Sequence, residues 1–143
     1  MDDRTLGRTG IQVSEIGFGC GNVGGMMVRG SHEEQVQAVQ CALDLGISYF
    51  DTAASYGDGQ SETNLGLVLA ELRPQVTVAT KVGIRQDDIN DIRGTVERSL
   101  EASLKRLGRD SVDILYLHSG ISPERGWAGG ENALSIQDVL GPG

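Results

Sequence analysis

Positive charge and long hydrophobic runs are both scarce in this sequence. The 143 residues carry 12 Lys and Arg against 20 Asp and Glu, which gives a formal net charge of −8. Nucleic acids and anionic membranes are bound by clustered Lys and Arg that neutralise phosphate, so this acidic balance argues against both partners. No apolar stretch approaches the roughly 20 residues that cross a bilayer, and the start, MDDRTLGRTG, has no apolar signal-peptide core. We therefore expect a cytoplasmic protein.

Cysteine and histidine are scarce as well, with two of each. Cys20 and Cys41 lie far apart, and we interpret them as free thiols in a reducing compartment rather than as a disulfide. His32 and His118 share no ligand spacing with each other or with the cysteines, so the sequence predicts no metal site.

Glycine is the residue in excess: 21 of 143, about twice its average usage of roughly 7%. The glycines separate regular apolar segments, which indicates tight loops between short elements. One glycine-rich loop is predicted over residues 21–30. Its Met26 and Met27 are interpreted as loop residues, although they and Trp127 could wall an apolar pocket.

Apolar periodicity predicts strands and helices that alternate along the chain. A hairpin at 4–13 precedes strands at 14–19, 47–51, 76–80 and 112–117, with helices at 32–45, 61–73 and 91–107. Ser31 and Glu34 have the spacing of a capping box, and Gly46 stands where a helix-ending glycine belongs. Such alternation implies a parallel sheet covered by helices.

Two folds satisfy this order of elements, a doubly wound sheet and a (β/α)₈ barrel. Gly19, Gly21 and Gly24 form the pattern G-x-G-x-x-G between a strand and a helix, which taken alone is a weak indication of a dinucleotide-binding sheet. The interval from these glycines to Ser31 is too long for the tight strand-to-helix turn of that fingerprint. We therefore favour the α/β fold of the (β/α)₈ TIM-barrel type.

Three predicted strands end at an ionisable residue: Asp51, Lys81 and His118. Because residues two apart share a strand face, all three are expected on the inward side at the carboxyl ends of the strands, where barrel active sites lie. Tyr56 follows five residues after Asp51 in a loop of the same end. Each residue taken alone has an ordinary structural explanation, such as a strand cap or a solvated charge. The repeated placement favours one shared site.

Four separated motifs carry a resemblance to a known family. The segment ISYFDTAASYGDGQSETNLG resembles the signature of the aldo-keto reductases, and LGRTGIQVSEIGFGCGNVGG resembles their amino-terminal hairpin and first barrel strand. TKVG and YLHSG fall where that family places its lysine and histidine. The resemblance extends from residue 4 to about residue 120. It implies an NADP-dependent oxidoreductase barrel whose catalytic tetrad is Asp51, Tyr56, Lys81 and His118.

The chemistry expected of this tetrad is hydride transfer to a carbonyl group. A carbonyl that accepts hydride develops negative charge on oxygen, and Tyr56 would supply the proton there. An isolated phenol is a weak acid at neutral pH, so the Lys81 cation, paired with Asp51, would help it release that proton. His118 would orient the carbonyl by hydrogen bonding.

The hydride belongs to a nicotinamide cofactor, and the resemblance implies NADPH. Gly19, Cys20 and Gly21 match the positions where the family's first loop approaches that cofactor, and Asp51 is expected to contact it as well. The expected substrate is a small aldehyde, ketone or sugar-like carbonyl compound, and the oligomeric state is left open.

The predicted strands supply only part of a barrel. A family barrel has eight strands and about 250 residues, whereas this sequence predicts four barrel strands and then a Gly/Pro-rich loop or tail over 119–143. We interpret residues 1–143 as the N-terminal half of an aldo-keto reductase barrel domain in a truncated chain, expected to be inactive by itself. The alternative is a catalytically inactive reductase-like subunit that acts as a binding module.

Overall fold

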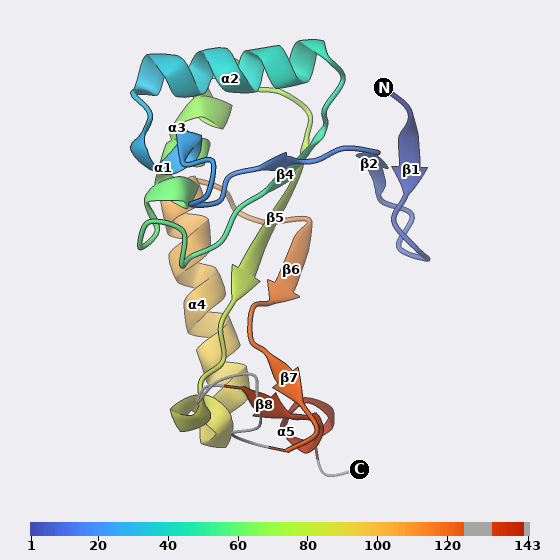
Figure 1. Ribbon diagram of the computed structural model, residues 1–143, viewed down its shortest axis with the longest axis vertical. Helices are drawn as coiled ribbons and strands as arrows, with labels where there is room; N and C mark the ends of the chain where they lie inside the picture. The colour runs from blue at the N-terminus through green and yellow to red at the C-terminus, as the bar shows by residue number, and fades with distance from the viewer. Residues whose placement is uncertain (125–132, 142–143) are drawn as a thin grey trace.

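A four-stranded parallel sheet forms the centre of the computed structural model, which describes residues 1–124 and 133–141. Its strands follow the chain order β3 (Phe18–Gly19), β4 (Tyr49–Asp51), β5 (Thr77–Val82) and β6 (Ile114–Leu117). Each strand lies beside the preceding one, always on the same side of it. Right-handed connections between strands in this order place all the connecting helices on a single face of the sheet. Figure 1 shows α3 and α4 along one side of the strands. A doubly wound sheet would reverse its strand order, so this order favours an arc of a barrel.

The other elements lie around this sheet. The helices are α1 (Met26–Arg29), α2 (His32–Asp44), α3 (Gln60–Leu72), α4 (Ile92–Leu107) and α5 (Ile136–Leu140), with a 3₁₀ helix η1 (Gln86–Asp91). Two short strand pairs complete the described residues: β1 (Asp3–Thr5) with β2 (Gln12–Ser14), and β7 (Ile121–Ser122) with β8 (Leu134–Ser135).

Local capping signals explain where the longer helices begin and end. The predicted capping box of α2 is confirmed: the Ser31 N–H donates to the Glu34 carboxylate at 2.8 Å, and the Glu34 N–H donates back to the Ser31 hydroxyl. The Ser31 N–H and, secondarily, the Ser31 hydroxyl donate to the Glu34 carboxylate and lower its pKa. Helix α4 begins where Asp91 accepts from the Gly94 N–H and ends at Gly108, whose φ of 63° favours glycine.

The main hydrophobic core lies between the sheet and the helices. Phe50 of β4 and Val78 of β5 are fully buried there, with Leu65 and Val68 of α3. Met27 is also fully buried, so the prediction that it is a loop residue was wrong. The glycine-rich segment folds into the short helix α1, which carries Met27 into the core. Trp127 lies outside the described residues.

Gly66 sets how closely α3 and α4 approach. A Cβ atom at this position would lie 2.5 Å from the carbonyl oxygen of Leu107. A side chain there would therefore push the two helices apart. This close packing holds the two helices that cover β5.

The β1–β2 hairpin lies at the amino ends of the barrel strands. Ser14 and Ser48, which precedes β4, exchange backbone-to-hydroxyl hydrogen bonds of 3.0 and 3.1 Å. Thr77, the first residue of β5, donates to the Gln12 carbonyl. The hairpin therefore occupies this end of the sheet and leaves the carboxyl ends of the strands to the site.

The strands differ from their predicted bounds in two places. Strand β5 continues through Lys81 and Val82 because both residues pair with β6, so Lys81 lies inside the strand rather than after it. The predicted strand at 14–19 is divided between the hairpin and the two-residue β3. Leu117, the last residue of β6, is 39% exposed.

The segment predicted as a loop or tail over 119–143 contains regular structure within its described residues. Ile121 pairs with Leu134 in the parallel β7–β8 bridge, and α5 follows directly. Ser135 caps α5 through a capping box with Asp138. The helix lies within the contiguous segment ALSIQDVL, while the bridge depends on residues that lie thirteen positions apart in the sequence.

Candidate active site

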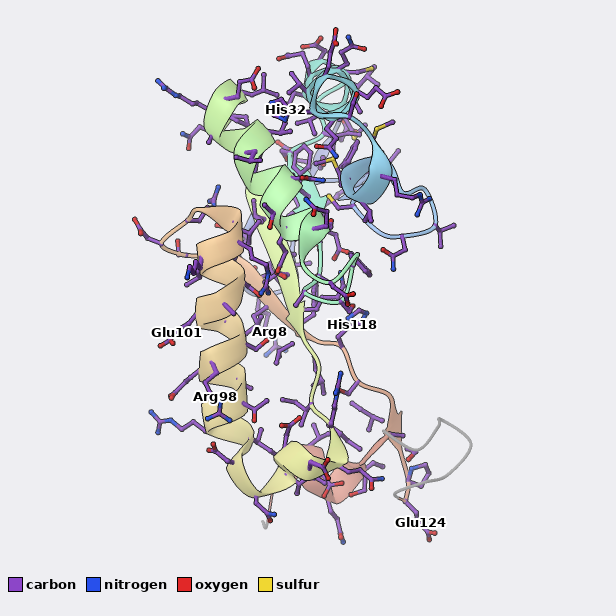
Figure 2. All side chains as sticks on the ribbon, turned by 90° about the vertical axis from the view of Figure 1, so that its left-hand side faces the viewer. Arg8, His32, Arg98, Glu101, His118 and Glu124 are labelled. Atoms are coloured by element: carbon purple, nitrogen blue, oxygen red, sulfur yellow. The ribbon has the colours of Figure 1, made fainter. Side chains whose placement is uncertain are left out.

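The four residues predicted to form a tetrad lie together at the carboxyl ends of the strands. Asp51 ends β4, Lys81 is next to last in β5, and His118 directly follows β6. Tyr56 lies in the loop between β4 and α3, and Figure 2 shows His118 beside this loop. The register explains the grouping, because Asp51 pairs with Ala79 and Lys81 lies two residues further along the same face.

Lys81 is held by two oxygen atoms from consecutive residues. Its ammonium forms an ion pair with the Asp51 carboxylate and donates a 2.8 Å hydrogen bond to the Thr52 carbonyl. The Lys81 side chain is 12% exposed and that of Asp51 is 28% exposed. These two oxygen atoms fix the position of the Lys81 charge, and solvent screens the ion pair less than a surface pair.

Tyr56 lies between the Lys81 ammonium and the His118 ring. The Lys81 Nζ atom is 4.8 Å from the centroid of the Tyr56 ring. The rings of Tyr56 and His118 meet edge to face, with centroids 5.8 Å apart and planes at 89°. Ser55 Oγ lies 3.4 Å from His118 Nδ1. The structure thus places a cation and an imidazole beside the same phenol ring.

The residues predicted to contact a cofactor differ in how they face the site. A Cβ atom at Gly19 would meet nothing within 4 Å, and one at Gly21 would lie 3.7 Å from Tyr56 Cζ. The Cys20 thiol instead packs in the hydrophobic core. The Cys20 N–H donates to the Asp51 carbonyl at 2.9 Å. Gly19 and Gly21 therefore border the site, whereas the Cys20 side chain does not.

The two cysteines are expected to react differently with an alkylating reagent. Burial, and secondarily the Asp51 charge, raise the pKa of the Cys20 thiol to about 12, whereas Cys41 is exposed on α2. The thiolate is the reactive form, so iodoacetamide should label Cys41 in the folded protein and Cys20 only after denaturation. Mass spectrometry of the folded and the denatured protein measures both events.

Cys41→Ser provides the control for this prediction. The folded variant should take up no label, and the denatured variant should take up one label, at Cys20. Rapid labelling of Cys20 in the folded variant would contradict the prediction. Because the folded-state pKa lies above the ordinary 9.0, any stability from this shift is present below pH 9 and declines as the pH rises toward 12.

A layer of buried polar side chains at the start of α3 supports the site. The Ser61 hydroxyl donates to the Cys20 carbonyl and lies 2.9 Å from the Thr52 hydroxyl, which donates to it. Ser61 therefore joins α3 to the residues that follow β3 and β4. Sequence reasoning used Ser61 only as the start of a helix, although a Ser in the first turn of a helix after a strand could have suggested this contact.

Glu62, the next residue, is a fully buried carboxylate with a partner on each oxygen. The Thr80 hydroxyl donates to one oxygen at 2.5 Å, and Arg106 Nε donates to the other at 2.6 Å. Thr80 directly precedes Lys81 in β5, and Arg106 belongs to α4. Sequence reasoning missed this network, which joins α3, β5 and α4 below the site.

A cleft of about 540 Å³ opens beside the tetrad. Its walls come mainly from the ends of β4, β5 and β6 and the residues after them, together with one residue of α4 and the residue before β8. The lining residues are Ala54, Ser55, Asp58, Lys81, Gly83, Ile84, Arg85, Ser99, His118, Ser119, Gly120 and Ala133. Most of these residues are polar or small. The cleft therefore offers a polar chamber that reaches two of the four tetrad residues.

Two further kinds of feature are absent from the described part of the chain. Within residues 1–124 and 133–141, no helix is both long and apolar enough to span a bilayer. The same residues contain no group of three or more His, Cys, Asp or Glu placed to hold a metal ion.

Comparison with known proteins relates this site to one family. Residues 15–124 match the family model of the aldo/keto reductase family. L-galactose dehydrogenase of Arabidopsis thaliana is 39% identical over 118 residues, which cover 80% of this chain and 37% of that protein.

Two solved structures are similar in fold and sequence. An aldo-keto reductase from Bacillus halodurans in its holo form has a TM-score of 0.68 and 32% identity, covering 84% of this chain and 41% of that one. An aldo-keto reductase from Klebsiella pneumoniae in complex with NADPH has a TM-score of 0.65 and 28% identity, covering 83% and 40%. The chain thus spans less than half the length of these relatives.

These findings confirm the resemblance that the sequence motifs carry and the barrel class of the fold. The sheet order, the single helical face and the neighbours agree on an α/β sheet that covers the amino-terminal part of a (β/α)₈ barrel. NADP is the cofactor of the family, as expected from the sequence. The chain belongs to the aldo/keto reductase family.

Proposed function

We propose that this site reduces the carbonyl group of an aldehyde, ketone or sugar-like compound with hydride from NADPH. One observation carries the proposal: the Lys81 ammonium, fixed by Asp51, lies 4.8 Å from the centre of the Tyr56 ring, and His118 meets the same ring edge-on. This arrangement provides a proton donor, a stabilising cation and a further polar group beside an open cleft.

The strand ends have room for the nicotinamide end of the cofactor. Cβ atoms added at Gly19 or at Gly83 would meet nothing within 4 Å, so the space over these positions is not filled by side chains. Gly19, Gly21 and Asp51 would hold the cofactor there, as the first loop does in the family resemblance. When bound, the nicotinamide supplies the hydride.

Each side chain of the tetrad would have a separate role in the reaction. The Tyr56 hydroxyl donates its proton to the carbonyl oxygen as the carbonyl carbon gains hydride, so the product is an alcohol. The Lys81 cation stabilises the negative charge left on the Tyr56 oxygen, and Asp51 keeps Lys81 in place. His118 directs the carbonyl oxygen toward Tyr56 by hydrogen bonding.

We further propose that residues 1–143 contribute the N-terminal half of the barrel domain. An eight-stranded barrel has four more strands than the β3–β6 sheet. The activity proposed for the whole protein is therefore that of this tetrad within a closed barrel. All four tetrad residues belong to this half.

A single-turnover experiment tests the proposed reaction. The whole protein that contains residues 1–143, in excess over an aldehyde, is mixed with NADPH that carries deuterium at the transferable position, and the alcohol is analysed by mass spectrometry. We expect deuterium on the former carbonyl carbon, and excess protein makes slow transfer detectable. NADPH binding without transfer to aldehydes, ketones or sugars would contradict the proposal and favour a binding module. A lack of NADPH binding would contradict it as well.

A further inference from the structure

Arg85 is an arginine of the cleft whose charge has no partner among the described residues. Most other arginines in the described ranges have an acceptor, such as Glu62 for Arg106 or Asp91 for Arg98. No hydrogen bond or ion pair of the Arg85 guanidinium is found among residues 1–124 and 133–141. Arg85 is nevertheless one of the residues that line the same cleft as Lys81 and His118.

The backbone beside Arg85 is fixed to the residue that follows His118. The Ser119 hydroxyl accepts from the Ile84 N–H and donates to the Ile84 carbonyl, both at 2.8 Å. On its other side, the Arg85 N–H donates to the Asp88 carboxylate at 2.8 Å. Arg85 therefore starts from a backbone held in a constant position relative to His118.

The charges of the cleft differ in how far they are compensated. Lys81 has a carboxylate partner within the protein, Asp51. Asp58 supplies a carboxylate to the same cleft from the loop that carries Ser55 and Tyr56. Arg85 thus offers a planar, permanently charged group to the cleft, the kind of donor that suits a carboxylate.

We propose that Arg85 determines substrate specificity by binding the carboxylate of an anionic carbonyl compound whose carbonyl group lies at Tyr56 and His118. This inference rests on the proposed reductase function and narrows it to carbonyl compounds that also carry a carboxylate. The polar groups of the cleft, among them Asp58 and Ser99, suit hydroxyl groups between the two ends of such a substrate.

A matched pair of substrates tests this inference. The probes are 4-carboxybenzaldehyde, which is anionic, and its neutral methyl ester, each reduced with NADPH. We expect kcat/KM to favour the anion by roughly tenfold, the lower end of what a hydrogen bond to a charged group contributes. Arg85→Gln should reduce this preference about tenfold, and Arg85→Lys should retain part of it because the charge remains without the planar fork.

Arg93→Gln is the control variant, because Arg93 is 91% exposed on α4 and pairs with Glu97 away from the cleft. It should keep the preference of the unaltered protein. An unchanged preference in Arg85→Gln, or no preference in the unaltered protein, would overturn the inference. The rate with the ester reports whether each variant is folded.

Direct binding separates this inference from the proposed reaction. NMR signals of the His118 ring are followed during titration with each aldehyde in the absence of NADPH. Tighter binding of the anion that Arg85→Gln abolishes supports the inference even if neither aldehyde is reduced, an outcome that would contradict only the reductase function. Equal binding of both aldehydes would overturn the inference.

Discussion

Tyr56→Phe is expected to lower the rate of carbonyl reduction by about 10²–10⁴-fold, the usual contribution of a general acid. The substitution removes the hydroxyl and keeps the ring, which contacts the Lys81 ammonium and the edge of His118. The loop and the fold should therefore persist, and NADPH affinity should change little. Single-turnover rates with an excess of protein, together with an NADPH titration, measure the two effects.

Tyr49→Phe is a matched control for this prediction. Tyr49 lies on the same strand face as Asp51, and its hydroxyl is 3.1 Å from that of Tyr116. Burial and this hydrogen bond raise the pKa of Tyr49, so it is a poorer acid than an ordinary phenol. Its loss should cost far less activity than the loss of the Tyr56 hydroxyl. Equal rates for Tyr56→Phe and the unaltered protein would remove Tyr56 from the proposed mechanism.

Glu62→Ala is expected to lower the free energy of unfolding by about 3–5 kcal/mol, the cost of breaking a buried ion pair from one side. The Glu62 carboxylate is fully buried, and the change removes the acceptors of Arg106 and Thr80. The Arg106 side chain is 29% exposed, so water can hydrate part of its charge after Glu62 is removed. We therefore expect a value near the lower end of this range. Urea denaturation followed by circular dichroism measures the change.

Glu71→Ala on the same helix provides the comparison. Glu71 pairs with His32 at the surface, and both side chains are more than half exposed. Removing such a pair should change stability by about 0–1 kcal/mol. If the two Glu variants had equal stability, the Glu62 network could not be a main support of the α3–β5–α4 packing.

Features that depend on neighbouring residues were predictable from the sequence. The capping box of Ser31 and Glu34 is a local motif, so the start of α2 follows from a few adjacent residues. The period of two along a strand placed Asp51 and Lys81 on one face before any fold was known. Together with the alternation of strands and helices, these patterns determined the fold class and which residues could meet.

Tertiary structure decided the features that depend on distant residues. Met27 is buried because α1 packs against α3, and no local pattern distinguishes it from a loop methionine. Glu62 and Arg106 are 44 positions apart, so the sequence alone would suggest that each is a surface charge. They become partners only because α3 and α4 pack together. Ile84 and Ser119, 35 positions apart, fix Arg85 beside His118 in the same way. Sequence patterns thus determined the elements and the faces of this protein, whereas packing between distant elements decided which charges are buried, paired or left for a ligand.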